Sequence, residues 1–98
     1  MTKDMIQFEN SLQALAQLVA LCKRDQLVRE LANRLDLRRQ TVYLWDSPDC
    51  NLSNRAAKLR LLEISRLPGA VLAPIALFAK EAVEALEAQE DVGREGLR

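Results

Sequence analysis

The sequence has no histidine and only two cysteines, Cys22 and Cys50, which lie far apart in the chain. Two separated cysteines complete neither a zinc site nor a disulfide scaffold, so we expect no metal and no cofactor. Glycine-rich loops and clustered carboxylates are missing as well. Because acid–base and nucleophilic catalysis depend on such groups, the sequence predicts that this chain is not an enzyme.

Turn-forming and strand-forming residues are also few. The chain has three glycines, three prolines and only 4% aromatic residues, whereas leucine and alanine are abundant. An all-β domain needs many more turns, and strands favour β-branched and aromatic residues. Leucine and alanine are strong helix formers, so the fold class that we predict is all-α.

Long apolar runs are absent too. A membrane-spanning helix needs about 18 consecutive apolar residues, and the longest apolar stretch, 68–79, is interrupted by prolines. The N-terminus carries Asp4 and Glu9 and lacks the basic segment of a secretory signal. We therefore expect no membrane association and a cytoplasmic location. The 98 residues are enough for one domain, predicted at 1–90, with a frayed tail at 91–98.

The net charge is zero, yet the charges are unevenly distributed along the chain. The middle, 22–66, has ten basic and six acidic residues and thus a net charge of +4. The flanking segments 1–21 and 67–98 carry net charges of −1 and −3. A basic segment between acidic ones is typical of a protein in which one surface meets phosphate and another faces elsewhere.

Helical spacing of apolar residues predicts five helices. In the first, over 5–22, a heptad pattern is formed by Met5, Phe8, Leu12, Leu15, Val19 and Cys22. This pattern fits either an intramolecular core or a dimeric coiled coil. The other helices are expected at 26–35 with Asp25 as N-cap, at 39–46, from the Ser53 cap to the break at Pro68-Gly69, and at 70–89. The inward residues predicted for the fourth helix are Ala56, Leu59, Leu62 and Ile64.

The most informative segment is 27–45, LVRELANRLDLRRQTVYLW. It places two short amphipathic helices on either side of a turn at 36–38. Ala32 supplies the small side chain needed where such helices cross, and Asp36 tolerates the left-handed backbone that the turn requires. The apolar residues that the two helices share are Leu31, Leu35, Leu37, Val42 and Trp45. The segment therefore predicts a helix-turn-helix made of the second and third helices.

This segment resembles the helix-turn-helix of phage Cro and CI-type repressors and their bacterial relatives. Their pattern appears here as Leu31-Ala32, Asp36-Leu37, Gln40-Thr41-Val42 and Trp45. Two positions depart from it, because Asp36 replaces the usual turn glycine and Arg38 replaces the usual serine or threonine cap. The resemblance implies a five-helix, repressor-like bundle. It also implies a sequence-specific transcriptional regulator, a repressor of phage or mobile-element type, that reads double-stranded DNA as a homodimer.

In such a protein the third helix enters the major groove of the DNA. The residues expected to contact bases are Arg38, Arg39, Gln40, Thr41, Tyr43 and Leu44. Arginine recognises guanine, glutamine recognises adenine, and threonine and leucine contact the thymine methyl group. The residues expected at phosphates are Arg29, Arg34, Arg55 and Lys58, with Lys23, Arg24 and Arg60 as further candidates.

Pairing of two copies is expected because one helix-turn-helix contacts few base pairs. The resemblance favours the last helix as the dimer interface, with the stripe Val71, Ile75, Phe78, Ala82 and Leu86, although the first helix also has apolar surface to pair. An alternative interpretation is a regulator that occupies another protein, such as an antitoxin-like or anti-activator module. Zero net charge favours this alternative, since weak basic charge lowers the affinity for DNA.

Overall fold

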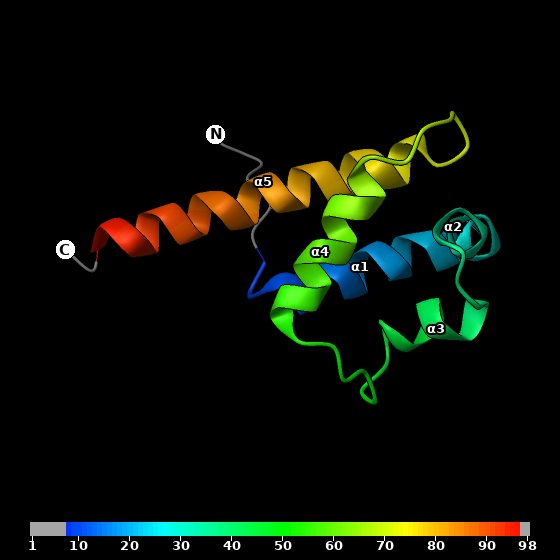
Figure 1. Ribbon diagram of the computed structural model, residues 1–98, viewed down its shortest axis with the longest axis horizontal. Helices are drawn as coiled ribbons and strands as arrows, with labels where there is room; N and C mark the ends of the chain where they lie inside the picture. Colours follow the sequence, from blue (N-terminus) through cyan, green and yellow to red (C-terminus); the bar gives the residue numbers. More distant parts are fainter. Residues whose placement is uncertain (1–7, 97–98) are drawn as a thin grey trace.

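The described part of the chain forms five helices, shown in the computed structural model of Figure 1. The structure describes residues 8–96, with side chains as far as Gln89. The helices are α1 (Ser11–Arg24), α2 (Val28–Leu35), α3 (Arg39–Leu44), α4 (Asn54–Ser65) and α5 (Ala73–Gly96). Because no strand occurs within 8–96, the predicted all-α fold is confirmed for this part of the chain.

The body of the molecule consists of α1, α4 and α5, which all contact one another. In Figure 1, α5 lies along the top, α1 runs beside it in the opposite direction, and α4 crosses both. Completely buried side chains from these three helices form the core, among them Leu15, Leu18, Leu61, Ile64 and Ile75. At one end of this body lie α2 and α3, where α2 contacts α1 and α3 contacts α2.

Helix α1 begins at Ser11 because Asn10 caps it. The Oδ1 atom of Asn10 accepts a hydrogen bond of 2.9 Å from the backbone N–H of Gln13, which satisfies one of the free amides at a helix start. The heptad residues Leu15, Val19 and Cys22 are completely buried within this single chain. Their burial fits the intramolecular-core interpretation of the heptad pattern, whereas its first residue, Met5, lies outside the described residues.

The connection between α1 and α2 differs from the prediction, and Asp25 is not the N-cap of α2. Instead, Asp25 is the C-cap of α1, and its backbone N–H donates to the carbonyl of Leu21. Gln26 then takes up left-handed backbone (φ 60°), and the N–H of Leu27 donates to the carbonyl of Cys22 at 2.8 Å. This Schellman-type closure occupies the residues that an N-cap at Asp25 required, so α2 begins only at Val28 and has no side-chain cap.

The start of α4 agrees with the prediction, but its inward face does not. The hydroxyl of Ser53 accepts a hydrogen bond of 3.1 Å from the N–H of Ala56, as expected for an N-cap. The buried residues of α4 are Ala57, Leu61 and Ile64, whereas Leu59 is 60% exposed and Ala56 and Leu62 are half-buried. Leucines at 59, 61 and 62 allow two helical faces, and the packing against α1 and α5 selects the one through Leu61.

Helix α5 begins at Ala73, later than predicted, and continues through Gly96, past the predicted end at Gln89. Residues 91–96 of the predicted tail belong to α5. Pro74 lies in the first turn of α5, where the missing N–H breaks no helical hydrogen bond. Within the described chain no helix combines the length and the apolar character needed to cross a membrane.

Candidate functional site

The turn between α2 and α3 has the geometry that the sequence predicts. Asp36 has left-handed backbone (φ 59°, ψ 45°) at the end of α2. The N–H of Leu37 donates to the carbonyl of Ala32 at 2.8 Å, which closes α2 with a Schellman motif. Arg38 is the N-cap of α3 and makes no side-chain capping bond. This agrees with the prediction, because arginine here replaces the serine or threonine whose hydroxyl would cap the helix.

One face of α3 is held firmly by the rest of the protein. Val42 is completely buried, and Trp45, directly after the helix, is only 4% exposed. The guanidinium of Arg60 on α4 lies 5.5 Å from the centre of the Trp45 ring, a cation–π distance. Trp45 is thus a core residue that ties the end of α3 to α4.

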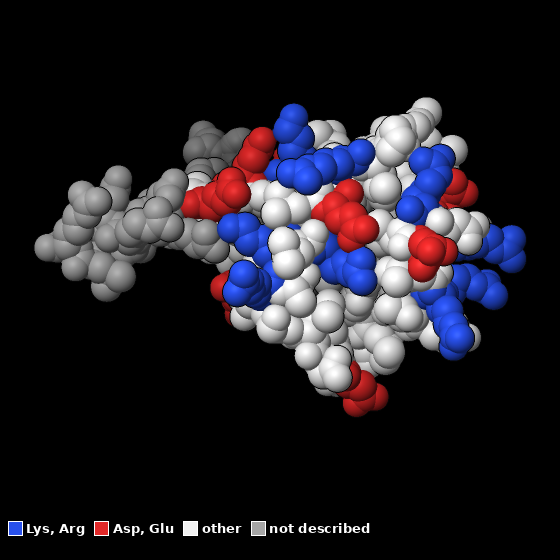
Figure 2. Space-filling model, in the orientation of Figure 1, with Lys and Arg blue, Asp and Glu red and all other residues white. Residues whose placement is uncertain are grey.

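The opposite face of α3 is open. Five of the six predicted base-contacting residues are exposed, namely Arg38, Arg39, Gln40, Tyr43 and Leu44. Tyr43 is 44% and Leu44 48% exposed, whereas Thr41 is half-buried. Figure 2 shows basic side chains gathered at the end of the molecule where α2 and α3 lie.

A shallow depression of about 350 Å³ lies where α1, α2 and α3 meet. Its lining residues are Lys23, Gln26, Val28, Arg29, Arg39 and Tyr43. The Nζ atom of Lys23 is 5.5 Å from the centre of the Tyr43 ring and 3.1 Å from Oδ2 of Asp46. The fold thus brings together three basic residues from different helices. Sequence reasoning missed Gln26, whose place depends on a left-handed turn that no pattern indicated.

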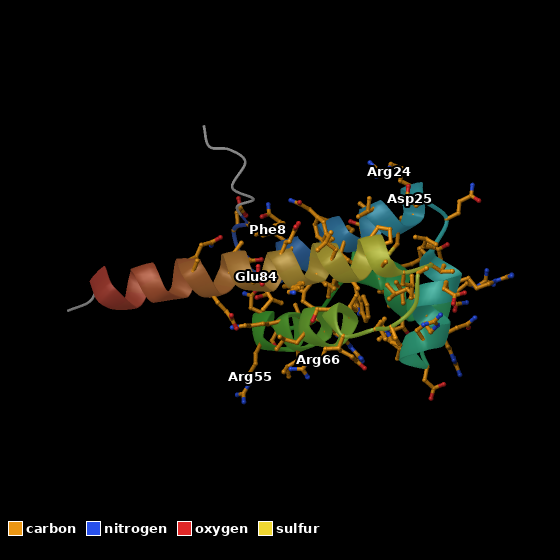
Figure 3. All side chains as sticks on the ribbon, turned by 90° about the horizontal axis from the view of Figure 1, so that it is seen from above. Phe8, Arg24, Asp25, Arg55, Arg66 and Glu84 are labelled. Atoms are coloured by element: carbon orange, nitrogen blue, oxygen red, sulfur yellow. The ribbon has the colours of Figure 1, made fainter. Side chains whose placement is uncertain are left out.

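Two of the predicted phosphate ligands are engaged within the protein. Arg34 donates from Nη1 to the carbonyl of Pro68 at 2.7 Å and from Nε to Glu30 at 3.1 Å. Lys58 on α4 is half-buried, with Nζ 3.9 Å from a carboxylate oxygen of Glu87 on α5. A third, Arg55, projects from the start of α4, separated from α2 and α3 along the molecule (Figure 3). Of the residues predicted at phosphates, Arg29 and the further candidate Lys23 line the depression.

The α2–α3 surface is the exposed side of α2, α3 and the turn between them. Some of its charged side chains have ion-pair partners within the protein and others do not. Of the acidic residues near this surface, Glu30 and Asp46 pair with Arg34 and Lys23. Asp36, in the turn between α2 and α3, is exposed and has no ion-pair partner among residues 8–89. Three exposed arginines, Arg29, Arg38 and Arg39, have no ion-pair partner among residues 8–89. Three unpaired arginines thus stand against one unpaired carboxylate, Asp36, and the surface keeps an excess of positive charge.

The predicted dimer stripe on α5 is largely interior. Ile75 and Ala82 are completely buried and Leu86 is 4% exposed, because α5 packs on both α1 and α4. These three side chains serve the core of a single chain and are not available as a surface. Of the predicted set, Val71 is 53% exposed and Phe78 is half-buried.

The two cysteines differ in burial. Among the described residues no group of three or more histidine, cysteine or acidic side chains is placed to hold a metal ion. Burial, and to a lesser degree the nearby charge of Asp25, raises the pKa of the Cys22 thiol to about 12. Cys22 is therefore a protonated core residue at neutral pH, and Cys50 is half-buried after α3.

Compared with known proteins, the chain matches no family model, no curated protein and no solved structure. What the α2–α3 surface binds is therefore inferred from the exposure, charge and geometry of its own residues.

Proposed function

We propose that the α2–α3 surface binds double-stranded DNA and that the chain is a sequence-specific transcriptional repressor. The observation that carries this proposal is the concentration of uncompensated arginines, Arg29, Arg38 and Arg39, beside the open face of α3. DNA phosphates neutralise such charges and release counterions, which supplies most of the affinity of DNA-binding proteins. Of the carboxylates that oppose this binding, Glu30 and Asp46 have internal partners, and Asp36 offsets only one of the three arginines.

The exposed side chains of α3 suit the major groove. Arg39 and Gln40 are the types that recognise guanine and adenine in bidentate fashion, and Leu44 can contact a thymine methyl group. Because Val42 and Trp45 are buried, α3 is fixed in orientation while these side chains remain free. A rigidly held helix with free polar side chains is the arrangement that base reading requires.

The depression between α1, α2 and α3 suits a phosphate of the DNA backbone. Lys23, Arg29, Arg39 and Tyr43 line it. Val28, the first residue of α2, also lines it, and no side chain caps this end of the helix. Uncapped amides at a helix start favour an anion, so these groups together would fix the position of α3 on the duplex.

The first experiment is selection of bound sequences from a random duplex pool, at low and at physiological salt. Enrichment of a defined sequence is the expected result and gives the site directly. If the folded protein enriches no sequence at either salt concentration, DNA reading is excluded. The alternative of a regulator that occupies another protein then takes its place.

A pair of arginine variants tests which residues read the site. Arg39→Ala is expected to weaken specific binding by about 1–3 kcal/mol and to relax the preference at one base pair. Arg66→Ala is the matched control, since Arg66 is also exposed and has no ion-pair partner in the described chain, but it follows α4 rather than α3. Equal losses in both variants would mean that only overall charge matters, which contradicts base reading by α3.

A further inference from the structure

The outer side of α4, opposite its buried residues, carries two leucines between two arginines. Arg55, Leu59, Leu62 and Arg66 follow one another at helical spacing, so that they form a single row along α4. Leu59 is 60% exposed, both arginines are exposed, and Leu62 is half-buried. Figure 3 shows Arg55 and Arg66 on the same side of α4, the side away from α5. We call this row the outer face of α4.

The positive charges at the two ends of the outer face are uncompensated. Neither Arg55 nor Arg66 has an ion-pair partner among residues 8–89. Glu63, the sole acidic residue of α4, is already paired with Arg60 at 2.8 Å. Exposed apolar surface rimmed by charged side chains marks a contact site. The complement of this one is an apolar surface with carboxylates at both ends.

We propose that the outer face of α4 binds an amphipathic helix of another protein, one with apolar residues at its centre and acidic residues on either side. The face offers side chains only, because the backbone groups of α4 are bonded within the helix. A partner segment must therefore satisfy its own backbone groups, as a helix does. Helices pack by interlocking rows of side chains, and α4 presents the row through Leu59 and Leu62.

The spacing of the two arginines sets where the partner needs its acidic residues. Arg55 and Arg66 are 11 positions apart, which is about 16 Å along a helix axis. A partner helix lying along α4 in either direction meets both arginines if its carboxylates have the same separation. The two leucines then contact the apolar residues between those carboxylates.

The leucines favour a protein helix over DNA or an anionic membrane as the occupant. Contacts to the outside of DNA come from polar and charged groups, so Leu59 and Leu62 would gain nothing from phosphates. A helix that binds a membrane buries its broad apolar face in the lipid, whereas the broad apolar face of α4, through Leu61, is inside the protein. The pairing of leucines with unpaired arginines therefore points to an acidic amphipathic helix.

A pair of labelled helical peptides tests the charge complementarity. The first has central leucines and glutamates about 11 positions apart, and the second has lysines in place of the glutamates. Fluorescence anisotropy is expected to show that the wild-type chain binds the glutamate peptide and not the lysine peptide. Arg55→Ala and Arg66→Ala should each weaken this binding about two- to fivefold, and Arg55→Glu/Arg66→Glu should prefer the lysine peptide. Failure of the wild-type chain to bind the glutamate peptide, or equal binding of both peptides, overturns the proposal.

Two leucine variants locate the binding site. Leu59→Gln is expected to raise the dissociation constant of the glutamate peptide roughly tenfold, because it removes the apolar contact without adding charge. Leu77→Gln is the matched control, since Leu77 is 55% exposed but lies on α5, and it should bind normally. Circular dichroism checks that both variants keep their helices. Equal losses in the two variants would show that the peptide does not sit on α4.

Further measurements separate this inference from DNA binding and from other occupants. The outer face shares no residue with Arg29, Arg38 and Arg39, so Leu59→Gln should keep the DNA affinity of the wild-type chain. A parallel loss of DNA affinity would assign the face to DNA instead. Displacement of the glutamate peptide by phosphatidylglycerol vesicles would assign it to a membrane, and self-association that Leu59→Gln abolishes would assign it to a second copy. Each of these three results overturns the proposal.

Discussion

Two residues, Gln26 and Asp36, carry left-handed backbone without being glycine, at φ 60° and φ 59°. Each ends a helix and directs the chain into the next element, α2 in one case and the turn before α3 in the other. Left-handed backbone costs a residue with a Cβ atom about 1–2 kcal/mol, and aspartate less than most. The orientation of the α2–α3 surface is thus obtained at some cost in stability.

Glycine at either position is expected to stabilise the fold. We expect Gln26→Gly to raise the free energy of unfolding by up to about 1 kcal/mol and Asp36→Gly by less, since aspartate already tolerates this backbone. Urea denaturation monitored by circular dichroism measures both. Asp49→Gly is the control, because Asp49 is exposed without positive φ, and glycine there should give no gain. A loss of stability in Gln26→Gly would contradict the backbone argument.

The two cysteines are expected to differ in reactivity. Since the pKa of Cys22 is raised from 9.0 to about 12, roughly a thousandfold less thiolate is present at neutral pH than for an ordinary thiol. A thiol reagent should therefore modify Cys50 first and Cys22 only after unfolding. Between pH 9 and about 12 the unfolded chain loses the Cys22 proton and the folded chain keeps it, so this residue lowers stability as the pH rises. Equal modification rates in the native protein would contradict the burial of Cys22.

At the scale of single elements, local patterns predicted individual turns and caps well, but not the start of α2, the ends of α5 or the inward face of α4. The turn at Asp36, the cap at Ser53 and the burial of Trp45 depend on neighbouring residues and were predicted correctly. The inward face of α4 was not, because Leu59 and Leu61 fit helical spacing equally well and only contact with α1 and α5 separates them. Tertiary packing also decided that Ile75 is interior rather than interfacial.

The side chain of Arg34 links α2 to a segment that is distant in the sequence. Its guanidinium joins α2 to the loop before α5 through the carbonyl of Pro68, and it also lies close to Gly69, where an added Cβ atom would come within 3.2 Å of Nη2. Gly69 has φ 102°, a backbone that side chains rarely adopt. Arg34 therefore holds this loop rather than serving as an open phosphate ligand.

Arg34→Met is expected to lower the free energy of unfolding by about 1 kcal/mol, since it removes the bond to Pro68 and retains most of the apolar stem. Arg29→Met is the comparison variant on the same helix, because Arg29 has no ion-pair partner among residues 8–89. Arg29→Met should keep its stability and lose DNA affinity, and Arg34→Met should do the reverse. Thermal melts and DNA titrations of the two variants measure both effects. If both variants change equally in stability and in DNA affinity, Arg34 has no structural role distinct from that of Arg29.

The whole molecule has zero net charge but is polarised. Among residues 8–89, three unpaired arginines lie at the α2–α3 end, and the unpaired acidic residues Glu81 and Glu84 lie on α5. Polarity of this kind allows DNA affinity despite zero net charge, because only charge near the phosphates releases counterions. We expect the logarithm of the DNA-binding constant to fall linearly with the logarithm of the salt concentration. Arg38→Gln should reduce the slope of that plot by about 1 if Arg38 meets a phosphate, and Arg66→Gln should leave it unchanged. An unchanged slope in Arg38→Gln would remove Arg38 from the phosphate contacts.

The burial of Trp45 has an optical consequence for the whole protein. It is the sole tryptophan of the sequence, and it lies at the junction of α3 and α4 beneath the guanidinium of Arg60. Its emission wavelength therefore reports the hydration of that junction, without any attached dye. A red shift that precedes the loss of helical signal during heating would reveal α3 detaching from an otherwise folded body. The fluorescence of Trp45 thus reports whether α3, the helix that we propose reads DNA, stays packed against α4.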